Sequence, residues 1–198
     1  MTPFELVFAV YGLLLGLAVA EVLGGFSRAL KLKRGAKPVK IGWLTPLLGL
    51  FVMLDLMSFW MVAWAARDQI AANYGTLIAV LAIVGIYYLA ATLIFPDDPE
   101  DWPDFDDWYD KQNRLVIGGM LTANVLSWIG QIALEIAAPS ADAEAMSDTA
   151  MLVAAGGTLA IVALLGALLA VKGRRANVAM LGVLIAVLVV AGVGGEMV

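Results

Sequence analysis

The chain has 198 residues, of which 62% are hydrophobic and 15% charged, and its mean hydropathy is +0.91. Soluble domains contain about 45–50% apolar and about 25% charged residues, so this composition excludes an ordinary soluble domain. The net charge of −5 gives no support for nucleic-acid binding. Cysteine and histidine are both absent, which excludes disulfides, thiol chemistry, the usual zinc sites and Ser-His-Asp catalysis. We expect no cofactor.

Apolar segments long enough to cross a bilayer recur along the whole chain. A hydrocarbon core about 30 Å thick needs about 20 apolar residues in a helix. The sequence therefore predicts an all-α membrane protein, a single domain of residues 1–198 built as a polytopic bundle of about six transmembrane helices. The expected spans are residues 4–26, 41–66, 74–95, 115–138, 149–171 and 177–193.

The first span carries Glu5 before its apolar stretch and basic residues after it, the reverse of a cleavable signal peptide. We therefore expect a retained first helix with its N-terminus outside, continuing into the basic segment 28–40. Between the fifth and sixth spans, Gly173 suits a tight turn, and Asn177 is the expected N-cap of the sixth.

Lysine and arginine set the expected orientation. Eleven of the 12 lie in alternate connections, and only Arg67 lies in the other set. The positive-inside rule makes loops 28–40, 96–114 and 172–176 cytoplasmic, with both termini on the non-cytoplasmic side. We expect a multi-pass protein of a cell membrane, and the compactness of the chain favours a bacterial inner membrane.

Asp55 is the most informative single residue. It lies near the middle of the second span, where a charge costs at least about 2.5–3.5 kcal/mol, and such residues usually face the bundle interior and serve a function. Ser58, one turn further on, shares its face. The alternative is a protonated Asp55 held by an interhelical hydrogen bond in a purely structural role.

Glu21 is a second carboxylate within a span. It lies nearer the cytoplasmic end, so its cost is lower and its functional reading weaker. Its natural partner, Arg28, is seven residues away and would have to snorkel toward it.

The fourth span carries a polar stripe, since Asn124, Ser127, Gln131 and Glu135 fall on one narrow helical face. Such a stripe must face protein or water. It either lines a path from the outer surface toward Asp55, or bonds another helix or a second copy of the chain.

These residues suggest an acidic path without an internal base, which suits protons or cations. The expected function is a proton- or cation-handling transporter or channel subunit. The alternative is a non-catalytic membrane subunit that assembles with a membrane partner or as a homo-oligomer. No enzymatic motif is present, so an enzyme is not expected. The path residues are Asp55, Glu21, Ser58, Asn124, Ser127, Gln131 and Glu135.

Two further groups have competing interpretations. Aromatic residues suggest a cage for an organic cation, although the interfacial aromatic belt is the favoured reading; they are Trp60, Trp64, Trp128, Tyr87 and Tyr88. The segment 96–111 is acidic and aromatic. We expect it to neutralise the basic segment 28–40, rather than to bind a divalent ion or a basic partner, and to form a short interfacial helix before the fourth span.

Overall fold

The computed structural model describes residues 3–34, 39–139 and 148–196, and 84% of it is helical without a strand in these ranges. Five helices are long and apolar enough to cross a membrane, and one more contains a shorter apolar stretch, Ala155–Ala170. The structure thus confirms an all-α polytopic bundle. The elements are α1 (Pro3–Lys33), α2 (Leu44–Ala65), α3 (Tyr74–Thr92), the 3-10 turn η1 (Pro99–Asp101), α4 (Phe105–Ala137), α6 (Asp148–Ala170) and α7 (Arg174–Glu196).

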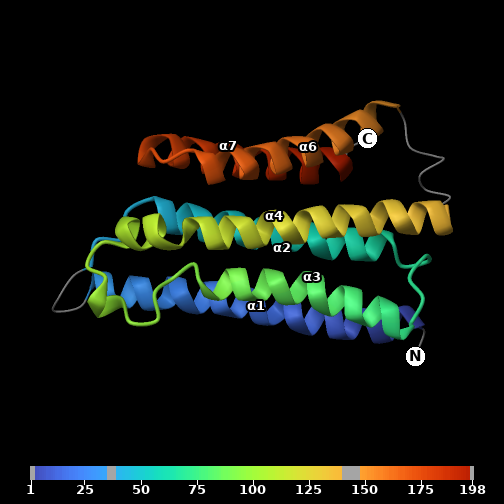
Figure 1. The fold of residues 1–198 in the computed structure, drawn as a ribbon, viewed down its shortest axis with the longest axis horizontal. Helices are drawn as coiled ribbons and strands as arrows, with labels where there is room; N and C mark the ends of the chain where they lie inside the picture. The colour runs from blue at the N-terminus through green and yellow to red at the C-terminus, as the bar shows by residue number, and fades with distance from the viewer. Residues whose placement is uncertain (1–2, 35–38, 140–147, 197–198) are drawn as a thin grey trace.

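The long helices pack in three layers of two (Figure 1). α1 packs on α3 in the lower layer, α2 and α4 form the middle layer, and α6 packs on α7 in the upper layer. The middle layer is covered from below by α1 and α3 and from above by α6 and α7. The centre of the molecule therefore lies at α2 and α4.

Successive long helices run in opposite directions, so successive connections lie at opposite ends of the bundle. α1 begins and α7 ends on the right of Figure 1, as an even number of crossings requires. We call the left-hand end, with Lys40, Lys111 and Arg174, the basic end. The assignment of this end to the cytoplasm remains a prediction from the lysine and arginine pattern.

The connections at the basic end are joined by backbone and side-chain bonds that we call the loop clamp, made by Lys40 with Pro103, Asp104 and Phe105. The Lys40 N–H donates to the Pro103 carbonyl at 2.8 Å, and the Phe105 N–H donates to the Lys40 carbonyl at 2.9 Å. Lys40 Nζ lies 2.6 Å from Asp104 Oδ2. The clamp ties the α1–α2 connection to the start of α4.

The start of α2 is held by α4 as well. The Leu44 N–H, one of the donors left free at a helix start, donates to Asp106 Oδ1 at 3.3 Å. One residue further on, Thr45 Oγ1 donates to the Phe105 carbonyl at 3.0 Å. These bonds fix the register of α2 against α4, and this register sets the depth of Asp55 relative to α4.

Two local expectations are wrong. Residues 105–114 are not a separate interfacial helix or a loop, because α4 begins at Phe105 and runs without a break; Asp104 caps it by accepting from the Asp106 N–H at 2.9 Å. Asn177 does not cap the sixth span. α7 begins earlier, at Arg174, and the Asn177 N–H donates to the Gly173 carbonyl at 2.9 Å.

Candidate functional site

Asp55 lies at the centre of α2 with 1% of its surface exposed. Eleven residues separate it from Leu44 at the start of α2, a helical rise of about 16 Å. This is about half the thickness of a hydrocarbon core, so Asp55 lies near the depth of the bilayer centre. Its Oδ2 accepts a 2.9 Å hydrogen bond from Tyr87 Oη of α3 and a 2.8 Å bond from Asn124 Nδ2 of α4. We call Asp55, Tyr87 and Asn124 the carboxylate network. It connects three helices from two layers.

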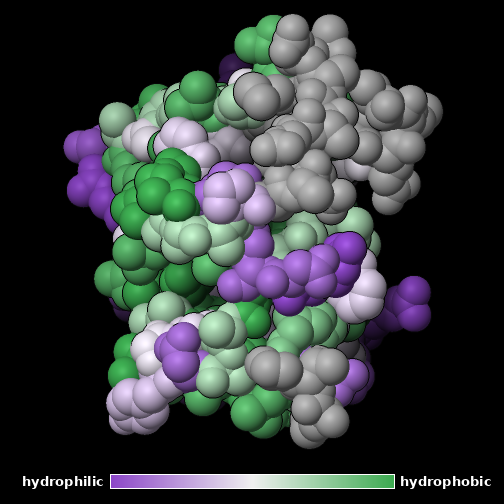
Figure 2. All heavy atoms as spheres, turned by 90° about the vertical axis from the view of Figure 1, so that its right-hand side faces the viewer, coloured by the Kyte–Doolittle hydropathy of each residue, from purple (hydrophilic) through white to green (hydrophobic). Residues whose placement is uncertain are grey.

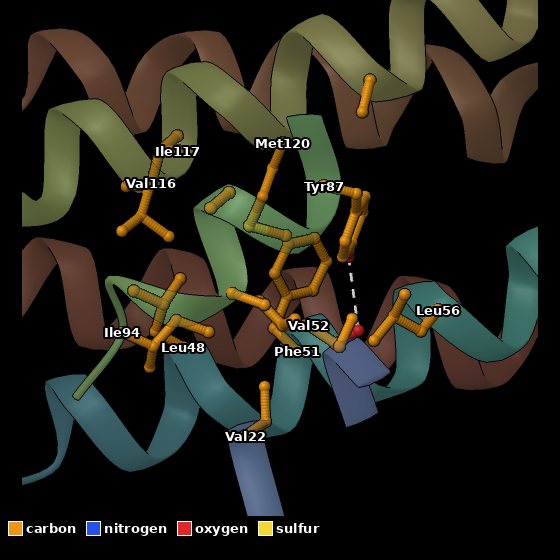
Figure 3. Close-up of a cluster of buried hydrophobic side chains, with 14 of the residues drawn as sticks. Val22, Leu48, Phe51, Val52, Leu56, Tyr87, Ile94, Val116, Ile117 and Met120 are labelled. Carbon is orange, nitrogen blue, oxygen red and sulfur yellow. Dashed lines mark hydrogen bonds between the residues drawn. The ribbon is translucent and has the colours of Figure 1, made fainter. Parts of the chain in front are cut away.

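The two donors also have second acceptors. Tyr87 Oη lies 3.3 Å from the Val52 carbonyl, one turn before Asp55 on α2, and Figure 3 shows Tyr87 reaching toward this part of α2. Asn124 Nδ2 also donates to the Met120 carbonyl at 3.1 Å. An amide carries two hydrogens and serves both of its acceptors at once, whereas a tyrosine hydroxyl carries one and serves a single acceptor. Tyr87 therefore has a choice that Asn124 does not.

Apolar side chains pack around Tyr87, one member of the network (Figure 3). Val52 and Leu56 flank Asp55 along α2. The Phe59 and Tyr87 rings pack edge-on, with their centroids 5.2 Å apart. The Tyr11 hydroxyl of α1 donates to the Phe59 carbonyl at 2.8 Å rather than to Asp55. The contacts described for Asp55 include no charged partner, so its hydrogen bonds are with neutral groups.

α4 presents different chemistry on the two sides of Asn124. Toward the basic end lie Val116, Ile117 and Met120, all fully buried and apolar (Figure 3). Toward the opposite end lie Ser127 and Gln131. Along α4, the neighbours of Asn124 are therefore buried and apolar toward the basic end and polar toward the opposite end.

The outer part of the polar stripe makes its own contacts. Gln131 is exposed, and its Nε2 lies 3.4 Å from the Ser127 carbonyl and 3.5 Å from Ser127 Oγ. Glu135 accepts a 2.8 Å bond from Gln69 Nε2, which also donates to the Ala138 carbonyl at 2.7 Å. Figure 2 shows hydrophilic residues running across the middle of this end of the bundle, between apolar residues above and below.

Two predicted path residues have partners outside the carboxylate network. Ser58 Oγ lies 3.4 Å from the Leu54 carbonyl of its own helix. Glu21 Oε1 lies 3.1 Å from Arg28 Nη2, so a snorkelling arginine does reach it across seven residues. The structure therefore brings Asp55 and Asn124 together and gives Ser58 and Glu21 other roles.

The aromatic cage is not assembled. Trp60 and Trp64 both pack edge-on against Phe8 of α1, with ring centroids 6.1 and 6.0 Å apart, and both are exposed to the surroundings of the bundle. Tyr87 instead lies in the core against Phe59. Trp60 and Trp64 therefore lie in a different aromatic contact group from Tyr87.

The acidic segment acts as a structural element. Arg174 Nη2 lies 2.5 Å from Asp107 Oδ1 and 2.6 Å from Asp110 Oδ2, and Lys111 Nζ lies 4.7 Å above the Trp102 ring. Neutralisation by basic residues is thus observed: among the described residues, Arg174 pairs with two aspartates of this segment, and Lys40 of the basic segment pairs with Asp104. The residues that the structure describes contain no group of three side chains able to hold a metal ion.

The loop clamp perturbs its two charges in opposite directions. The hydrogen bond to Asp104 and the attraction of its charge raise the pKa of Lys40. Partial burial raises the pKa of Asp104, but bonds from Lys40 and the Asp106 N–H outweigh it and leave that pKa below its usual value.

Sequence reasoning missed two residues of the polar system. Tyr87 was assigned to an aromatic belt, although a hydroxyl inside a charge-free span already required a partner. Gln69, in the α2–α3 connection, carries no pattern that would single it out.

Fold and site together define a polytopic α-helical membrane protein with a hydrogen-bonded carboxylate at its centre. Comparison with models of known families, with curated proteins and with solved structures finds no match for this chain.

Proposed function

We propose that the protein is a proton-handling transporter or channel subunit in which Asp55 binds and releases the transported proton. The observation that carries the proposal is the position of Tyr87 Oη, which lies within hydrogen-bond distance of both Asp55 Oδ2 and the Val52 carbonyl. A purely structural tether would need only one of these acceptors.

This position lets Tyr87 form a hydrogen bond with Asp55 whether Asp55 is ionised or protonated. When Asp55 is ionised, Tyr87 donates its single hydrogen to Oδ2. When Asp55 is protonated, Oδ2 donates to Tyr87 Oη, and Tyr87 donates to the Val52 carbonyl. The change reverses one hydrogen bond and moves no heavy atom, so Asp55 Oδ2 and the Tyr87 hydroxyl keep a partner in both states.

A proton fits the network better than a metal cation. Hard metal cations such as Mg²⁺ and Ca²⁺ are coordinated by several oxygen ligands. Here the groups aimed at Asp55 Oδ2 are an O–H and an N–H, which would direct partial positive charge at a bound cation. A proton requires no such shell.

The polar stripe supplies the access route in this proposal. Ser127, Gln131 and Glu135 continue from Asn124 toward the end of the bundle opposite the basic end, whereas Ile117 and Met120 exclude water from the other side. Protons then enter from the non-cytoplasmic side, given the orientation that the basic residues predict.

The test is proton flux into liposomes that contain the purified protein, driven by a pH gradient with a potassium–valinomycin clamp of the membrane potential. Wild type is compared with Asp55→Asn, which keeps an oxygen acceptor for Tyr87 and Asn124 but cannot release a proton. We expect flux in wild type and at least about a tenfold loss in Asp55→Asn, the change that about 1.4 kcal/mol produces.

Glu21→Gln is the matched control, because it neutralises a carboxylate that pairs with Arg28 outside the network. It should retain wild-type flux. Equal flux in wild type, Asp55→Asn and protein-free liposomes, with protein shown to be folded, would overturn the proposal.

The exposed amide of Gln131 favours a second candidate, a non-catalytic subunit that assembles with a membrane partner or a second copy. A polar side chain within a span must face protein or water, so an adjoining helix would explain it. Cross-linking through Gln131→Cys, with no flux in any variant, would support this candidate instead.

A further inference from the structure

A groove at the basic end of α1 has the chemistry of a lipid site. Its volume is about 390 Å³, and one helical face supplies its walls. The lining residues are Leu23, Phe26, Ser27, Leu30, Lys31 and Arg34. Apolar residues line the part nearer the bundle centre, and two cations line the part at the helix end.

The depth of the groove matches the boundary of a bilayer. α1 has 31 residues and is about 46 Å long, well over the thickness of a hydrocarbon core, so its last turns project into the headgroup region. Leu23 and Arg34 are separated by a rise of about 16 Å. The groove therefore runs from acyl-chain depth to phosphate depth.

The apolar part of the groove is open to lipid and firmly backed. Leu23 and Leu30 are 50% and 59% exposed. Phe26 packs on Phe95 of the α3–α4 connection, with ring centroids 5.0 Å apart, and so does not turn outward. The groove therefore lies open beside the exposed Ser27.

Within the described part of the chain, neither Lys31 nor Arg34 of the groove forms an ion pair. Elsewhere at the basic end, Arg28 pairs with Glu21, Lys40 with Asp104, and Arg174 with two aspartates. Among the described residues, no ion pair or hydrogen bond to a side chain is recorded for Lys31 or Arg34. Two neighbouring positive charges at the membrane surface attract an anion.

A neighbouring cavity of about 520 Å³ shares Lys31 but differs in charge. Its lining also contains Arg28, but the carboxylates of Asp98 and Asp101 balance the two cations and repel a phosphate. The favourable position for an anionic headgroup is therefore between Lys31 and Arg34, on the side of the first groove.

We propose that this groove binds one anionic phospholipid, with the headgroup phosphate at Lys31 and Arg34 and an acyl chain along Leu23, Ser27 and Leu30. The two positive charges favour an anionic over a zwitterionic headgroup, and the apolar part of the groove favours a lipid over a free phosphate.

The experiment is native mass spectrometry of the purified protein in detergent, titrated with phosphatidylglycerol or with phosphatidylcholine. We expect one phosphatidylglycerol to bind at least about tenfold more tightly than phosphatidylcholine. Lys31→Gln/Arg34→Gln should remove that preference. Ser27→Trp should fill the apolar part of the groove and weaken phosphatidylglycerol binding several-fold, although both charges remain.

Lys33→Gln/Arg175→Gln is the matched control, because it removes the same charge at the basic end without touching the groove lining. It should retain the preference, and all variants must match wild type in thermal unfolding. The proposal is overturned if both double variants lose binding equally, if Ser27→Trp binds as wild type, or if inorganic phosphate alone displaces the lipid. None of these readouts depends on proton flux.

Discussion

Gly42 lies with its backbone directly against the carboxylate of Asp106, and its φ is +65°. A side-chain carbon at this position would overlap that carboxylate, and the left-handed conformation is unfavourable for other residues. The same carboxylate accepts from the Leu44 N–H at the start of α2. The glycine therefore allows one helix to be capped by a side chain from another.

Gly42→Ala should destabilise the protein by at least about 1 kcal/mol, because the backbone strain alone is of that size. The measurement is thermal unfolding in detergent. Gly85→Ala in α3 is the control, since a side-chain carbon there meets nothing within 4 Å and alanine favours a helix. A lower unfolding temperature for Gly85→Ala than for Gly42→Ala would contradict this account of the turn.

Tyr87→Phe tests the reversible hydrogen bond. Removing the hydroxyl takes a donor from the ionised Asp55, and a bond to a charged group contributes about 1.5–3 kcal/mol, so proton flux should fall about tenfold or more. Tyr11→Phe removes a buried hydroxyl that bonds the Phe59 carbonyl and not Asp55. It should lower the unfolding temperature and leave flux within about twofold of wild type. Equal effects of both variants on flux would refute the role of Tyr87.

Asn177→Leu should stabilise the protein. Asn177 is fully buried in the first turn of α7, and neither its Nδ2 nor its Oδ1 has a hydrogen-bond partner among the residues that the structure describes. Burying such a group costs about 1–3 kcal/mol, and a leucine of similar shape avoids that cost. Thr45→Val provides the contrast, since the Thr45 hydroxyl is bonded to the Phe105 carbonyl and its loss should destabilise. A destabilised Asn177→Leu would show that the amide has an essential partner.

The stability contributed by the Lys40–Asp104 pair should depend on pH at both extremes. The pKa of Asp104 is lowered, so its contribution is present above the ordinary aspartate range and is lost as pH falls through the lowered value. The pKa of Lys40 is raised, so its contribution is present below the ordinary lysine range and is lost as pH rises through the raised value. The difference in unfolding temperature between wild type and Lys40→Met should therefore be constant near neutral pH and shrink in acid and in alkali. A difference that is unchanged in acid would contradict the pairing.

The fold class followed from hydrophobicity alone, because bilayer thickness fixes the length of each apolar segment. The contact between Asp55 and Asn124 was anticipated only as a possibility, since each residue had to face protein but helix order was unknown. The packing of α4 beside α2 decides it. Tyr87 and Gln69 could not be assigned from spacing, because their roles depend on partners 32 and 66 residues away.

The predicted start of the fourth helix was wrong for a physical reason. The acidic residues 104–110 look like solvated loop, yet Asp104 caps α4, and Asp107 and Asp110 bind Arg174 of α7. Charges that are paired across the fold permit a helix to continue beyond its apolar segment. The partners lie too far along the chain to be read from local pattern.

The positive-inside rule gives Lys40 and Arg174 a role before the helices pack. On the orientation that this rule predicts, they act during insertion as unpaired charges that help to keep their loops in the cytoplasm, because acidic neighbours count little in that decision. After the helices pack, the same two charges bind Asp104, Asp107 and Asp110. A swap of Lys40 and Asp104 would therefore rebuild the finished contact while weakening the earlier instruction, so a correctly bonded pair does not by itself guarantee a correctly inserted chain.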